Sequence, residues 1–125
     1  FNCRYKWSIG EKNIDLNAMN LLAQKLIGYF DFSAFGASRG DGSVGDPWKT
    51  LFLLSWSLRG WDLTLETEGT GYLYKMVRTL TATLLSVGLG QISEQYVLDC
   101  FQSGVRREKI VTAPARGLVL DKVFY

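Results

Sequence analysis

One segment of this 125-residue chain places a charge among apolar residues. Residues 71–78 read Gly-Tyr-Leu-Tyr-Lys-Met-Val-Arg, and the spacing predicts a helix whose apolar stripe lies beside Arg78. A guanidinium at an apolar surface is costly to desolvate unless an anion faces it. The sequence offers no obvious partner, so we expect Arg78 to belong to one half of an active site. The alternative is an arginine that reaches solvent and only rests its stem on the apolar face.

Two tyrosines accompany these cations. Tyr74 lies one helical turn before Arg78 and could hold its guanidinium in place. Tyr5 lies between Arg4 and Lys6 in a segment that alternates charged and bulky residues, which is typical of a strand. At that position an ordinary core aromatic is the competing interpretation.

Other candidates are weaker when the residues are taken alone. Lys49 and Lys75 have the character of solvated charges, and Leu118 that of simple core packing. The glycines of residues 69–71 match no phosphate-binding loop motif. Residues 39–41 spell Arg-Gly-Asp, an adhesion tripeptide that also occurs by chance in loops rich in Gly and Ser.

Composition limits the chemistry. The chain has no His, which removes the commonest general base and the commonest zinc ligand. Cys3 and Cys100 lie far apart without metal-ligand spacing, so we expect no metal site, two half-buried thiols and a reducing compartment, cytoplasmic or organellar. The net charge of +2 is too small to indicate nucleic-acid binding by itself.

The length and the hydrophobic content of 47% suffice for one domain with a real core. No run is long enough for a membrane span, and no secretory signal is present, so we expect neither membrane association nor secretion. The first residue, Phe1, lies inside a predicted strand, which suggests a fragment of a longer protein.

The elements that must position these side chains follow from periodicity and capping. Asp15 and Ser93 are predicted helix caps, and the glycines at 88 and 90 should end the helix that contains Arg78. Residues 31–35 read as a short connector and residues 36–47 as a surface loop. We expect an α+β domain over residues 1–125, an antiparallel or mixed sheet with helices on one face. The predicted strands cover residues 3–9, 48–58, 61–68 and 118–125, and the helices cover residues 16–27, 72–87 and 93–102.

Six segments, in order, resemble the C-terminal half of the tRNA pseudouridine synthase A family. Residues 4–7 are similar to its Arg-Tyr strand motif, and residues 71–78 to its helix motif that ends in Met-Val-Arg. The remaining matches are residues 31–35, 46–49, 84–88 and 112–118.

The resemblance implies an enzyme that converts uridine to pseudouridine in tRNA without a metal or organic cofactor. In that family the nucleophile is an Asp of the N-terminal half, which this chain lacks, and we do not transfer it to Asp41. Arg78 falls on the arginine that pairs with this Asp, and Tyr5 on the tyrosine that stacks on the uracil and is proposed to act in proton abstraction. Leu118 falls on the apolar residue of the pocket floor.

The resemblance also implies partners. These are tRNA and the missing N-terminal half, whereas the homodimer that family members often form is left open. Lys49 and Lys75 stand where many members have Arg and His, which bears on substrate choice more than on activity. Tyr74 would support the substrate site, and the expected phosphate contacts are Arg4, Lys6, Lys49, Lys75 and Arg116.

Two other functions stay open at this level. The first is a non-catalytic RNA-binding module of the same fold, which an upstream sequence without the Asp motif would favour. The second is a structural or adhesive domain that uses residues 39–41. On either reading, Arg78 would have no catalytic role.

Overall fold

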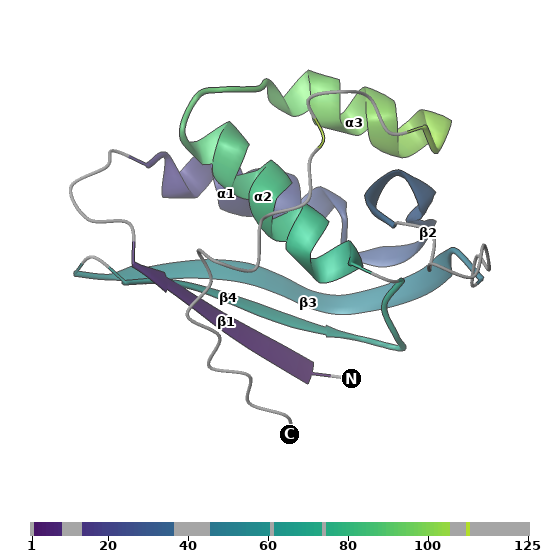
Figure 1. Cartoon of the computed structure of the whole chain (residues 1–125), viewed down its shortest axis with the longest axis horizontal. Helices are drawn as coiled ribbons and strands as arrows, with labels where there is room; N and C mark the ends of the chain where they lie inside the picture. The colour runs from purple at the N-terminus through teal and green to yellow at the C-terminus, as the bar shows by residue number, and fades with distance from the viewer. Residues whose placement is uncertain are drawn as a thin grey trace.

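The protein is an α+β domain in which helices cover one face of an antiparallel sheet (Figure 1). It is seen in a computed structural model that describes residues 14–36, 46–60, 62–73, 75–105 and 110, and the backbone of residues 2–8. The predicted fold class is therefore confirmed. The expected final strand at 118–125 and most of the expected loop at 36–47 lie outside the described residues.

The described sheet has four strands in the order β1-β4-β3-β2, and every neighbouring pair is antiparallel. The two central strands form a hairpin, as predicted, and Gly60 supports its tight turn with a φ of 60°. Leu63 and Leu65 point into the core and are fully buried. The strands are β1 (Asn2–Ser8), β2 (Gly28–Asp31), β3 (Trp48–Arg59) and β4 (Asp62–Gly69).

The prediction of an irregular connector at residues 31–35 was wrong. β2 ends at Asp31, and a 3₁₀ turn, η1 (Ser33–Phe35), follows it. Asp31 shapes this turn, since its Oδ1 accepts hydrogen bonds from the Ser33 N–H at 2.9 Å and from the Ser33 hydroxyl. A four-residue strand is too short to show alternation in the sequence. It forms because its backbone pairs with the first residues of β3.

A bulge at Leu51 and Leu53 bends β3 near its start. Gly69 lies opposite the bulge, where a Cβ would come within 2.7 Å of the Thr50 carbonyl oxygen. Just beyond, the Thr70 N–H donates to that oxygen at 3.0 Å, and the Thr50 N–H donates to the Thr70 hydroxyl at 3.1 Å. These bonds hold the chain that leaves β4 beside the start of β3.

Helix α1 (Leu16–Lys25) begins at its predicted cap, where Asp15 Oδ1 accepts the Ala18 N–H at 3.0 Å. Its apolar face packs on β3 and α2. Asn20 also binds β3 directly: its carbonyl accepts the Trp56 N–H at 2.8 Å and its amide donates to the Trp56 carbonyl at 3.0 Å. Because β2 pairs only with residues 48–51, this amide takes the place of a neighbouring strand farther along β3.

The second helix, α2 (Met76–Gly88), starts four residues later than predicted. The reason is local: the Met76 N–H donates to the Leu73 carbonyl in a turn, and Lys75 adopts a left-handed conformation with a φ of 58°. Leu73, expected in the helical stripe, instead lies before the helix and against Gly36. The third helix, α3 (Glu94–Ser103), begins after its predicted cap Ser93, which accepts the Tyr96 N–H at 3.1 Å.

An aromatic cluster joins α3 to the sheet edge. The Phe101 ring lies 5.3 Å from the rings of Phe30 and Phe32 and 5.8 Å from that of Phe35, measured between centroids. Cys100, expected to be half-buried, is fully buried, because it lies on the face of α3 that packs inward. The core therefore lies between the sheet and the helices and extends under α3.

Candidate functional site

Arg78 lies in the first turn of α2, three residues after the cap position Lys75. It is half-buried, and no described Asp or Glu forms an ion pair with it. Its neighbour one turn later, Ala82, is 9% exposed and small, so it leaves room beside the guanidinium.

Electrostatics make this position unusual for a cation. The first turn of a helix carries a partial positive charge, which favours acidic side chains and disfavours basic ones. The first turn of α2 has no acidic residue and carries Arg78, and Lys75 is the cap residue before it. Lys75 is exposed and has the left-handed backbone that few residues besides Gly adopt. The helix start and Arg78 therefore place positive potential at this end of α2, where a carboxylate or a phosphate would be stabilised.

Tyr5, Arg4 and Lys6 lie in the middle of β1, and their backbones are paired with β4. Tyr5 is opposite Leu65, Arg4 opposite Glu66 and Lys6 opposite Thr64. The predicted strand is confirmed, and it forms one edge of the described sheet.

Lys49 lies at the other side of the sheet, opposite Phe30 of the edge strand β2, and is half-buried. Tyr5 aligns through Leu65 with Trp56 of β3, which is seven positions beyond Lys49. At about 3.3 Å per residue, Lys49 is about 23 Å away along the sheet, and it does not join Tyr5 in one site. It lies instead near the chain that enters α2, through the bonds between Thr50 and Thr70.

Three predicted site residues, Tyr74, Arg116 and Leu118, lie outside the described residues. In the described part, no cluster of His, Cys, Asp or Glu could hold a metal ion. No helix in that part is long and apolar enough to cross a bilayer.

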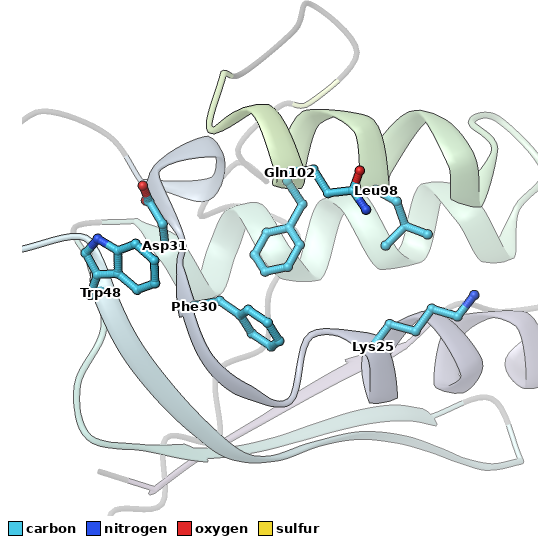
Figure 2. Close-up of a pocket in the computed structure, with 7 residues that line it drawn as sticks. Lys25, Phe30, Asp31, Trp48, Leu98 and Gln102 are labelled. Carbon is cyan, nitrogen blue, oxygen red and sulfur yellow. The ribbon is translucent and has the colours of Figure 1, made fainter.

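The structure contains a cleft of about 390 Å³ that sequence reasoning missed (Figure 2). It lies where α1, β2, β3 and α3 meet, and none of the predicted site residues lines it. The sequence carried no signal for it, because its walls come from four separate elements. The lining residues are Lys25, Phe30, Asp31, Trp48, Leu98, Phe101 and Gln102.

Together these features define a class: an α+β domain with helices on one sheet face and a helix start suited to an anion. Its sequence is matched over residues 22–125 by the family model for tRNA pseudouridine synthases. The tRNA pseudouridine synthase A of Thermoanaerobacter sp. (strain X514) is 38% identical over 121 residues, which cover 97% of this chain and 48% of that protein. The Bacillus subtilis (strain 168) protein of the same name is 35% identical over 112 residues, which cover 90% of this chain and 44% of that protein.

The chain therefore belongs to the tRNA pseudouridine synthase family. The family match includes the whole of α2 and hence Arg78. The chain spans about half the length of the curated relatives that it matches. The resemblance seen in the sequence motifs is confirmed at the level of the family.

Proposed function

We propose that the full-length protein containing this chain isomerises uridine to pseudouridine in tRNA. The observation that carries the proposal is the family match over residues 22–125, together with relatives named tRNA pseudouridine synthase A. In this reaction the N1–C1′ glycosidic bond breaks, a C5–C1′ bond forms, and C5 loses its proton while N1 gains one. This chain would supply part of the site, and the nucleophilic Asp would come from the other half.

Arg78 would pair with that Asp. The electrostatics of α2 support this role, because the helix start favours an anion beside Arg78. A charge-assisted pair between guanidinium and carboxylate orients the nucleophile as well as keeping it ionised. The half-buried position of Arg78 would strengthen the pair, since partial exclusion of water raises its electrostatic energy.

The remaining predicted residues would hold the substrate. Tyr5 would stack on the uracil after the base leaves its helical stack, and Leu118 would form the apolar floor. Tyr74 would support the guanidinium. The cations proposed to contact backbone phosphates are Arg4, Lys6, Lys49, Lys75 and Arg116.

The test is tritium release from tRNA transcripts that contain 5-tritiated uridine. We expect the full-length protein to release tritium and Arg78→Ala to lower the rate by at least about 1,000-fold, as for the loss of a charged group that acts on the nucleophile. Arg59→Ala is the matched control, because Arg59 is exposed at the hairpin and should keep full activity.

Undiminished turnover by a folded Arg78→Ala variant would remove Arg78 from the site. If the full-length protein binds tRNA but releases no tritium from any of several tRNAs, it is a non-catalytic RNA-binding module instead. Thermal unfolding of both variants separates a lost catalytic group from a lost fold.

A further inference from the structure

We infer that the cleft between β2 and α3 binds an arginine side chain presented by a partner protein. The cleft is separate from the proposed catalytic residues, and its walls combine aromatic rings with polar groups. Phe30 and Phe101 form part of an interlocked aromatic cluster, so the apolar wall is rigid. A volume of about 390 Å³ is ample for one long side chain.

One end of the cleft is electronegative. The Oδ1 of Asp31 is occupied by Ser33, whereas Oδ2 accepts no hydrogen bond from a described residue. This oxygen faces the C-terminal end of α3, where a Cβ placed on Gly104 would lie 4.0 Å from it. A helix C-terminus carries a partial negative charge, and the last turn of α3 has no basic residue to offset it. A cation is therefore stabilised here.

The other charges of the cleft do not cancel this potential. Lys25 lies at the far end from Asp31 and Trp48 (Figure 2), and its ammonium is paired with Glu94 of α3. Trp48 lies next to Asp31 at the electronegative end. An indole ring beside a carboxylate suits a planar guanidinium, which stacks on the ring while it donates to the oxygen.

The surroundings favour a protein as the source of this cation. Tyr29 and Trp48 are 63% and 46% exposed, and their ring centroids are 5.3 Å apart at the sheet edge. Exposed Tyr and Trp side chains are typical anchors of protein interfaces. An RNA strand is disfavoured, because its phosphates would meet the Asp31 carboxylate and the negative end of α3.

The experiment titrates the full-length protein with N-acetyl-Gly-Arg-Gly-amide and follows the Trp48 indole N–H by NMR. We expect the chemical shift of the Trp48 indole N–H to change and to saturate with added peptide. The peptide in which neutral citrulline replaces arginine should bind about tenfold more weakly. Asp31→Asn should weaken binding of the arginine peptide about fivefold. The amide oxygen of the new side chain can still accept the Ser33 N–H, so the turn is preserved. Asp99→Asn is the control, because Asp99 lies on α3 but outside the cleft.

Three results would overturn the proposal. The first is a lack of arginine-selective binding: either the indole chemical shift does not saturate up to about 50 mM arginine peptide, or the citrulline peptide binds equally tightly. The second is binding of putrescine as tight as that of the arginine peptide, which would indicate a site for free polyamines. The third is peptide binding only after Arg106→Gln and Arg107→Gln are combined, which would identify the chain's own arginines as the occupant.

Discussion

At the scale of single residues, the placement of charge at the start of α2 supports the role proposed for Arg78. The helix dipole disfavours a cation in the first turn, and Arg78 stands there without an acidic residue in the same turn. The left-handed backbone of Lys75 adds a conformational cost to the same turn. Costs that gather at one point of the fold are typical of functional positions, where the local arrangement serves a ligand.

Gly88 is a residue whose missing side chain permits helix packing. A Cβ there would lie 2.3 Å from Met19 Sδ and 3.0 Å from Ile14 Cγ2, and Met19 is fully buried. We therefore expect Gly88→Ala to lower the free energy of unfolding of the full-length protein by about 1–2 kcal/mol, despite the better helix propensity of Ala. Urea unfolding measures the change.

A double-mutant cycle isolates the cause of that loss. If the clash is with Met19, the effects of Gly88→Ala and Met19→Ala should be less than additive, because the second substitution removes the contacting atoms. Additive effects, or a stabilising Gly88→Ala, would contradict this account of the packing.

At the scale of elements, the ends of helices and strands depend on backbone hydrogen bonds as much as on side-chain pattern. The helix caps Asp15 and Ser93 act locally and could be predicted. The start of α2 could not, because the turn at Leu73 and the left-handed Lys75 oppose an apolar pattern that continues toward Tyr72. Pattern indicates which segment is helical, whereas local backbone geometry decides where it begins.

Asn20 offers a test of how α1 is held on the sheet. Its side chain satisfies the N–H and the carbonyl of Trp56, so Asn20→Ala removes two partly buried hydrogen bonds. We expect a loss of about 2 kcal/mol in the free energy of unfolding, measured with urea. Asn17→Ala, at an exposed position of the same helix, should change it by less than about 0.5 kcal/mol. Equal effects of the two variants would show that the Asn20 hydrogen bonds do not hold α1 on β3.

At the scale of the whole molecule, two unlike helix ends lie on either side of η1. Leu73, just before α2, lies against Gly36, and the end of α3 lies beside Asp31. The start of α2 gathers positive potential, whereas the end of α3 beside Asp31 gathers negative potential. The first would suit the carboxylate proposed to pair with Arg78, and the second the arginine proposed to enter the cleft.

The aromatic cluster should determine how firmly α3 is attached. Phe101→Ala removes three ring contacts, so we expect the free energy of unfolding to fall by about 3 kcal/mol. We also expect hydrogen exchange in this variant to be faster in α3 than in α1. Phe52→Ala, at a position 60% exposed on β3, is the matched control and should change the free energy of unfolding by less than about 0.5 kcal/mol. Uniformly faster exchange would show that α3 does not open separately.

The sequence by itself determined the fold class, both helix caps, the central hairpin and the family. These follow from periodicity, capping and motif order, which are local properties of the chain. Only the tertiary structure decided the strand β2, the burial of Cys100 and the distance of Lys49 from Tyr5. The cleft at Asp31 and Trp48 belongs to this second group, because residues from four elements create it. Pairing and packing bring distant segments together, and no window of sequence contains that information.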